Sequence, residues 1–164
     1  MKIIHFHPDG RMAMKFVAPL MEAEGKAGYR TQLIVSNDRD RAVEIVIPYD
    51  LSFFNLLVLP LALWKIMSCL RVHKPDLVIS HNSKSSLLPL LGAWLSRTRV
   101  RIYFNHGIPY IAYHGILRWL LQALEFCNCI LATDVVTVSG GMQTLLNNFY
   151  SRNKARIIHN GSAC

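Results

Sequence analysis

The chain has 164 residues, of which 52% are apolar and 17% are charged, and it carries a net charge of +8. This composition excludes a disordered chain, a collagen-like repeat and a coiled coil, and the length suits one domain of ordinary size. The 4 cysteines form no C-x-x-C pair, which argues against a zinc ribbon and a thioredoxin-type site.

The N-terminal part predicts strands that alternate with a helix. Residues 2–7 are a short apolar run ended by a Pro-Asp-Gly turn, and they predict the first strand. Residues 12–26 have helical character, and Pro19 within them predicts a kink or a late helix start. Two further strands are expected, at residues 31–36 and 43–47.

The segment at residues 51–71 has two interpretations. Its first part, residues 51–64, is almost wholly apolar, but it is too short to span a bilayer. We favour a buried crossover helix. The alternative is a helix that lies in the membrane interface, with four side chains at the level of the lipid headgroups: Trp64, Lys65, Arg71 and Lys74.

From residue 76 onward, short strands and longer helices alternate regularly. The expected strands are residues 76–80, 99–104, 134–138 and 155–158, and the expected helices are residues 83–96, 113–131 and 141–150. Ser83 is the expected N-cap of the first of these helices. This alternation indicates βαβ units, so the predicted fold is α/β, a Rossmann-like open and mostly parallel sheet with helices on both faces.

Polar residues gather where the predicted strands end, which is where open parallel sheets bind their ligands. Four of the 7 histidines follow strands in this way: His7, His81, His106 and His159. Imidazole can accept a proton from a hydroxyl group, and the helix starts after Asn82 and Ser139 offer free N–H groups to a phosphate. The pattern therefore predicts a ligand with hydroxyl and phosphate groups, unless these residues only cap helices and fill loops.

Several signatures of other sites are missing from the sequence. There is no G-x-G-x-x-G, no phosphate loop and no G-x-S-x-G, which argues against a nicotinamide dinucleotide, a P-loop NTPase and an α/β-hydrolase. No H-x-x-x-H spacing or carboxylate cluster predicts a metal, and no tightly bound cofactor is expected. Because no nucleic-acid-binding motif accompanies the basic residues, nucleic acid is not an expected partner.

Glu125 stands inside an apolar helix. An acid in that setting needs a partner or serves a ligand, unless it lies on the exposed outer face of the helix. The sequence leaves both possibilities open.

The order of the motifs resembles the N-terminal half of the retaining family-four glycosyltransferases of the GT-B fold. It is carried by K-P-D-L-V-I-S-H-N-S-K-S-S, R-V-R-I-Y-F-N-H-G-I-P-Y, A-L-E-F-x-N-x-I-L-A-T-D-V-V-T-V-S and I-I-H-N-G-S, and it covers essentially the whole chain. It is closest to the bacterial branch that builds capsule, O-antigen and similar glycans on a lipid diphosphate carrier.

The resemblance implies one domain and an activity that needs a second. Residues 1–164 would be the Rossmann-like N-terminal domain, which in this family mostly binds the acceptor. The C-terminal domain, which binds the nucleotide sugar as a co-substrate, is expected to be absent. We therefore expect a hexosyltransferase-type enzyme whose present chain, a fragment or one half of a split enzyme, has little turnover alone.

The resemblance also assigns site residues. His106 is implied as the catalytic residue, beside the transferred sugar and the acceptor hydroxyl. The residues expected to bind the acceptor or phosphate are Gly10, Arg11, His81, Asn82, Lys84, Asn105, Gly107, Glu125 and Ser139. The residues that match the domain crossover are Asn160 and Gly161.

The charge distribution predicts where the protein works. All the excess positive charge lies in residues 51–164, which are also the richest in large apolar residues. This combination favours an anionic membrane surface or a phosphate-bearing ligand with an apolar tail, with a solvated basic surface as the alternative. Since no export signal opens the chain, we expect a cytoplasmic protein, peripheral on the inner face of the membrane.

Two other functions stay open at this stage. One is a non-catalytic subunit that recruits the other half of a split glycosyltransferase to the membrane. The other is an unrelated, flavodoxin-like domain that binds nucleotides.

Overall fold

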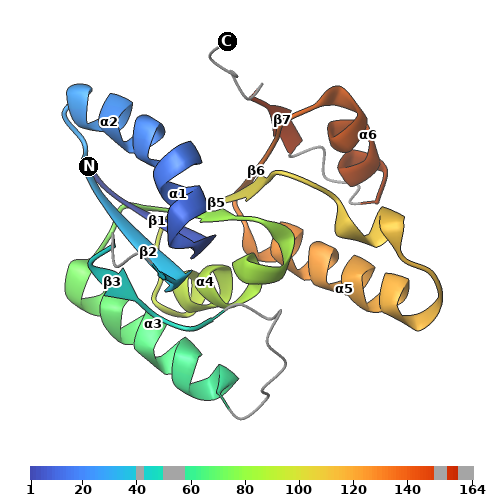
Figure 1. Cartoon of the computed structure of the whole chain (residues 1–164), viewed down its shortest axis with the longest axis horizontal. Coiled ribbons are helices and arrows are strands. Elements are labelled where there is room, and N and C mark those ends of the chain that lie inside the picture. The colour runs from blue at the N-terminus through green and yellow to red at the C-terminus, as the bar shows by residue number, and fades with distance from the viewer. Residues whose placement is uncertain (40–42, 50–57, 150–154, 159–164) are drawn as a thin grey trace.

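The computed structural model describes residues 1–39, 43–49, 58–149 and 155–158 (Figure 1). Within these residues, seven strands form one sheet in the order β3-β2-β1-β4-β5-β6-β7, and all neighbours are parallel. The strands are β1 (Lys2–Asp9), β2 (Arg30–Asn37), β3 (Ile45–Val46), β4 (Leu77–His81), β5 (Val100–Asn105), β6 (Asp134–Thr137) and β7 (Ala155–Ile157). The predicted Rossmann-like sheet is confirmed.

Helices cover both faces of the sheet, as predicted (Figure 1). They are α1 (Gly10–Phe16), α2 (Ala18–Lys26), α3 (Leu59–His73), α4 (Ser83–Leu95), α5 (Gly115–Leu131) and α6 (Gly140–Phe149), with a short 3-10 helix, η1 (Pro109–Ala112). On one face, Ala13 and Val17 pack against alternate residues of β2, Leu33 and Val35. Because side chains alternate along a strand, Ile34 points to the opposite face and belongs to another core cluster.

The core on that opposite face lies between the central strands and the crossover helices. Its strand residues include Ile4, Phe6 and Val78, and its helix residues include Ile66 and Leu88. A second cluster continues it toward β6 and β7, with Leu90, Tyr103, Cys129, Val135 and Leu146 among its members. These two clusters fix α3, α4, α5 and α6 on one side of the sheet.

The strand order reverses between β1 and β4. Ile3 pairs with Thr31 of β2 on one side and with Leu77 of β4 on the other. At the start of the second pair, the Lys2 N–H group donates to the Asp76 carboxylate at 2.7 Å, across 74 positions of sequence. The connections from these neighbouring strands leave in opposite directions, which opens a crevice at their carboxyl ends.

The helix predicted at residues 12–26 is two helices. α1 ends at Phe16, Val17 stands between them, and α2 begins with Pro19 in its first turn. Proline suits a first turn because its missing N–H group has no partner there in any case. The interruption predicted from Pro19 is thus confirmed, but it separates two helices, and the first of them begins at Gly10.

The segment around residue 60 forms α3, the crossover from β3 to β4. Ala62, Ile66 and Leu70 of this helix are buried, which confirms the crossover helix from residue 59 onward. Residues 51–57, the rest of the predicted apolar run, lie outside the described residues. Only one face of α3 is covered, and Trp64 remains 62% exposed.

α3 and α4 pack closely because α4 has a glycine at the contact. A Cβ atom at Gly92 would lie 2.7 Å from Cγ2 of Ile66, well inside an ordinary contact distance. The missing side chain therefore lets the two helices approach, and it fixes the position of α4 against the sheet.

Candidate functional site

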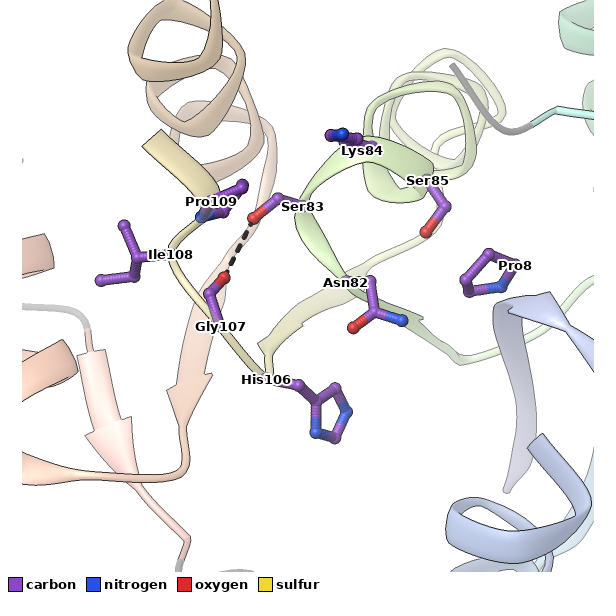
Figure 2. A pocket seen from close by; sticks show the side chains of 9 residues that line it. All are labelled: Pro8, Asn82, Ser83, Lys84, Ser85, His106, Gly107, Ile108 and Pro109. Atoms are coloured by element: carbon purple, nitrogen blue, oxygen red, sulfur yellow. Dashed lines mark hydrogen bonds between the residues drawn. The ribbon is translucent and has the colours of Figure 1, made fainter. Parts of the chain in front are cut away.

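A pocket of about 500 Å³ lies at the carboxyl ends of β1, β4 and β5, where the strand order reverses (Figure 2). Its lining residues are Pro8, Asn82, Ser83, Lys84, Ser85, His106, Gly107, Ile108 and Pro109. A smaller hollow beside it is lined by His7, Met12 and Phe16, among others, and shares Asn82 and His106. The structure thus brings together four predicted site residues: Asn82, Lys84, His106 and Gly107.

The loop after β4 has a strained backbone. Asn82 has φ 69° and ψ 149°, a conformation that is almost reserved for glycine and costs other residues about 1–3 kcal/mol. Hydrogen bonds hold the loop in place. The Asn82 N–H group donates to the Phe104 carbonyl at 3.1 Å, and the Ser86 hydroxyl donates to the Asn82 carbonyl at 2.6 Å. The contacts around this loop compensate the strain at the wall of the pocket.

The start of α4 forms one wall of the pocket. Asn82 is the N-cap, but its side chain makes no capping hydrogen bond. The prediction that Ser83 caps this helix is wrong, because Ser83 is the first helical residue and its hydroxyl donates to Glu125 at 2.6 Å. The first helical residues, Ser83, Lys84 and Ser85, all line the pocket, so this wall offers free N–H groups and a lysine to an anion.

Glu125 of α5 is fully buried beneath the pocket. Its carboxylate accepts hydrogen bonds from the Ser83 hydroxyl at 2.6 Å, from the Tyr103 hydroxyl at 2.8 Å and from the Asn105 amide. Burial raises the pKa of the Glu125 carboxyl, and the three donors oppose that shift. The sequence left open whether Glu125 has partners or lies on the exposed outer face of its helix, and the structure shows it buried with three partners.

This network anchors the loop that carries His106. Asn105, also fully buried, donates to Glu125 and accepts a hydrogen bond from the Gly107 N–H group at 2.8 Å. Ser83 meets the same loop from the other side, with its hydroxyl 3.4 Å from the Gly107 carbonyl (Figure 2). Glu125 and Asn105 therefore support the pocket from beneath and do not line it.

Four histidine rings and Phe104 cluster beside the pocket, and all but the tilted His7 ring are stacked. The His81 ring lies 5.7 Å from His5, 5.8 Å from His7 and 5.4 Å from His106, measured between ring centroids. Phe104 lies 4.6 Å from His106 and is nearly parallel to it. His5 and His81 are buried, whereas His106 reaches the pocket.

The environment of two of these rings, His81 and His106, favours their neutral form. Burial lowers the pKa of His81 well below its ordinary value, and the neighbouring histidines lower it further. Burial, with a smaller contribution from His7, lowers the pKa of His106 from 6.5 to about 4. Near pH 7 both rings are therefore neutral, and an imidazole in that state can accept a proton or a hydrogen bond.

Other predicted residues lie away from this pocket. Gly10 is buried at the start of α1, and Arg11 is exposed on the same helix, but neither lines the pocket. Ser139 precedes α6, and its hydroxyl accepts a hydrogen bond from the start of that helix at 3.4 Å. Asn160 and Gly161, the predicted crossover residues, lie outside the described residues.

Sequence reasoning missed His5 and Glu24. His5 is in the middle of β1, two positions before His7, so the two rings share a face of the sheet. That spacing was a usable signal. Glu24 contacts His5 at 2.9 Å only because α2 packs over β1, and no local pattern indicates this contact.

Among the described residues, no cluster of histidine, cysteine and carboxylate side chains could hold a metal ion. The profile of glycosyltransferase family 4 matches residues 15–162, which is most of the chain.

The chain belongs to glycosyltransferase family 4.

This family membership excludes the unrelated flavodoxin-like domain. The family 4 domain is 25% identical over 128 residues to CapM of Staphylococcus aureus, a capsular polysaccharide biosynthesis glycosyltransferase. That match covers 76% of this chain and 33% of CapM.

Solved structures resemble the same domain. A UDP-GlcNAc 2-epimerase from Neisseria meningitidis, bound to UDP-GlcNAc, has a TM-score of 0.74 at 13% identity, covering 98% of this chain and 46% of the epimerase. HepE of Anabaena, in complex with UDP and glucose, has a TM-score of 0.69 at 17% identity, covering 98% and 44%. The lipopolysaccharide outer core galactosyltransferase WaaB has a TM-score of 0.70 at 12% identity, covering 97% and 45%.

At these identities the structural likeness shows the fold alone. The family 4 domain spans about one third of CapM and less than half of each of the three solved proteins.

Proposed function

We propose that this chain is the acceptor-binding domain of a glycosyltransferase. The complete reaction would move a sugar from a nucleotide-sugar donor to a glycan or a lipid-diphosphate-linked acceptor, in the synthesis of a surface polysaccharide or glycoconjugate. The observation that carries the proposal is a neutral His106 ring in a pocket whose wall is the start of α4. The role of the relative CapM in capsular polysaccharide synthesis supports the choice of acceptor.

The two sides of the pocket suit two parts of such an acceptor. A sugar hydroxyl can donate a hydrogen bond to the neutral His106 ring, while a phosphate binds the start of α4. Lys84 adds a positive charge there, with its ammonium group 5.9 Å from the centre of the Tyr113 ring. Orienting the hydroxyl in this way would contribute to catalysis by positioning.

The donor side of the reaction would lie in a second domain. The nucleotide sugar would be a co-substrate held there, where charge on the departing phosphate is stabilised. This division of labour predicts that the chain alone has little turnover.

We further infer that the domain binds peripherally to an anionic membrane on its cytoplasmic side. None of the described helices is long and apolar enough to cross a bilayer. The helix α5 nevertheless presents Ile116, Trp119 and Leu120 to solvent, at 79%, 66% and 50% exposure, with Arg118 between them. In the sequence, these residues come shortly after the pocket residues Ile108 and Pro109. A lipid-linked acceptor would therefore reach the pocket from the exposed apolar surface of α5.

Ligand-observed NMR tests the acceptor assignment. The ligands are a short-chain lipid-diphosphate sugar, a panel of nucleotide sugars and an uncharged lipid. We expect the lipid-diphosphate sugar to bind, His106→Ala to weaken it, and His114→Ala, outside the pocket, to leave it unchanged. Tight binding of nucleotide sugars without binding of the acceptor would refute the proposal. Vesicle binding by a domain that binds neither the lipid-diphosphate sugar nor any nucleotide sugar would favour the alternative, a non-catalytic subunit that recruits a partner to the membrane.

The three tryptophans test the membrane surface. Trp64, Trp94 and Trp119 are exposed on α3, α4 and α5, at 62%, 53% and 66%. Three variants, each with two tryptophans replaced by phenylalanine, keep one fluorescent reporter each. With anionic vesicles, we expect a blue shift of the Trp119 emission and none for Trp94, which lies at the far end of α4 from the pocket. A blue shift of the Trp64 emission alone would place the membrane-binding surface on α3, and no shift in any of the three variants would refute membrane binding.

A further inference from the structure

A continuous chain of hydrogen bonds runs from α2 to the pocket. The Glu24 carboxylate lies 2.9 Å from Nε2 of His5. Nδ1 of His5 lies 3.4 Å from Nε2 of His81, which is the longest link. Nδ1 of His81 in turn lies 3.1 Å from Nε2 of His106. Each inner ring therefore uses both of its nitrogens within the chain.

The chain is shielded from water along most of its length. His5 and His81 are almost completely buried, and the Glu24 side chain is only 13% exposed. Phe104 covers the pocket end, with its ring 5.3 Å from His81 and 4.6 Å from His106. Buried polar atoms need hydrogen-bond partners, so these nitrogens satisfy one another.

The carboxylate sets the direction of every link. An ionised carboxylate can only accept, so His5 must carry its proton on Nε2. When this is the only ring N–H proton of His5, its bare Nδ1 accepts from Nε2–H of His81. A neutral His81 likewise has a bare Nδ1, which accepts from Nε2–H of His106. The nitrogen of His106 left without a proton is Nδ1.

The fourth ring does not enter this chain. Nδ1 of His7 lies 2.8 Å from the Asp9 carbonyl oxygen and 3.2 Å from the Asp9 backbone nitrogen. Its contact with His81 is a tilted ring contact at 5.8 Å between centroids.

We propose that Glu24 fixes the tautomer of His106 through His5 and His81, and so leaves Nδ1 of His106 as its proton-accepting nitrogen. The three residues are positioning residues, since none of them lines the pocket beside α4.

This tautomer has a chemical consequence, which rests on the proposed function. When an acceptor hydroxyl gives its proton to Nδ1 of His106, the Nε2 proton of His106 can pass to Nδ1 of His81. The Nε2 proton of His81 then passes to Nδ1 of His5. The net result is a deprotonated acceptor oxygen and one positive charge on His5, where the Glu24 carboxylate stabilises it at 2.9 Å.

Tautomers can be measured directly on this chain without any ligand. Long-range ¹H–¹⁵N spectra of the ¹⁵N-labelled protein at pH 7 distinguish Nε2–H from Nδ1–H in each ring. We expect Nε2–H for His5, His81 and His106. A protonated Nδ1 on His81 or His106 would overturn the proposal.

Two variants break the chain of hydrogen bonds at different links. Glu24→Leu removes the terminal acceptor, and His81→Phe keeps a ring in the stack without its nitrogens. In both we expect Nδ1–H to become populated on His106. The matched control is Glu22→Leu on the same helix, whose carboxylate is exposed and pairs with Lys26 at 2.7 Å. An unchanged His106 tautomer in folded Glu24→Leu or His81→Phe protein would refute the role of Glu24.

Addition of the short-chain lipid-diphosphate sugar separates this inference from the proposed function. A ligand-induced change at Nδ1 of His106 supports both. The expected tautomers with no change on addition would count against acceptor binding while supporting the role of Glu24.

Discussion

Replacement of the buried Glu125 should loosen both the domain and the His106 loop. Its carboxylate accepts from three buried donors, those of Ser83, Tyr103 and Asn105. In Glu125→Ala these donors can partly pair with one another, because the hydroxyl oxygens of Ser83 and Tyr103 are 2.9 Å apart and Asn105 is 3.0 Å from the Tyr103 hydroxyl. We therefore count one lost partner, not three.

The magnitude follows from that count. One unsatisfied buried donor costs about 1–3 kcal/mol. Loss of one buried methylene group adds about 0.8 kcal/mol. Burial disfavours the charged carboxylate, as its raised pKa indicates, so its removal returns part of this cost. We expect Glu125→Ala to lower the free energy of unfolding by about 1–3 kcal/mol, and Glu125→Gln, which keeps one acceptor oxygen, by about 1–2 kcal/mol.

Urea unfolding followed by circular dichroism measures the cost, and the Gly107 amide resonance reports on the loop. Glu22→Ala on the surface of α2 is the control, expected to change stability by less than about 0.5 kcal/mol. A carboxyl whose pKa is raised on folding destabilises the fold as pH rises, so the cost of Glu125→Gln should be smaller at pH 7 than at pH 4. Costs below about 0.5 kcal/mol for both variants, with an unmoved Gly107 resonance, would refute the anchoring role.

Three further predictions concern packing, acid and strain. Gly92→Ala should lower the free energy of unfolding by about 1–3 kcal/mol, because its Cβ atom would meet Ile66 at 2.7 Å. Gly25→Ala, with open space around it, should raise the free energy of unfolding by about 0.5–1 kcal/mol, and thermal melts compare the two variants. Between pH 6.5 and about 4, the free energy of unfolding should fall by about 1–2 kcal/mol, because the lowered pKa of His106 makes the unfolded chain bind more protons than the folded one. Urea titrations at both pH values check this, and an unchanged free energy of unfolding would contradict it. Asn82→Gly should raise the unfolding midpoint by relieving the strain at φ 69°, and a lowered midpoint would show that the Asn82 side chain stabilises the loop.

The sheet could be predicted from sequence because its strands are apolar runs bounded by turn residues. Once the strands are parallel, their carboxyl ends meet at one edge, so the strand pattern alone predicts that His81 and His106 lie near each other. Gly10 shows the limit of this rule, since it follows β1 but turns inward, lies against Asp38 and does not line the pocket. The rule gives the edge of the sheet, and the turn decides which residues reach the pocket.

The supporting contacts could not be predicted in this way. Glu125 meets Tyr103 and Asn105 only when α5 docks on the sheet, and Glu24 meets His5 only when α2 docks on the other face. Such contacts depend on the rotation of each helix about its axis, which apolar periodicity gives too coarsely to orient one carboxylate. The backbone angle of Asn82 depends equally on its surroundings, since local preference opposes it.

The pairing of β1 with β4 also has a consequence for the folding of this protein during its synthesis on the ribosome. β1 is an interior strand of the finished sheet, yet its neighbour β4 is synthesised about 70 residues later, which takes some 4–14 s at ordinary elongation rates. During that interval the side of β1 that will receive β4 is an open sheet edge, flanked by Ile3, Ile4 and Phe6. A nascent chain paused between β2 and β4 would therefore present the unpaired side of β1 to any neighbour able to pair with it, and a chaperone that covers this edge would protect the chain at that stage.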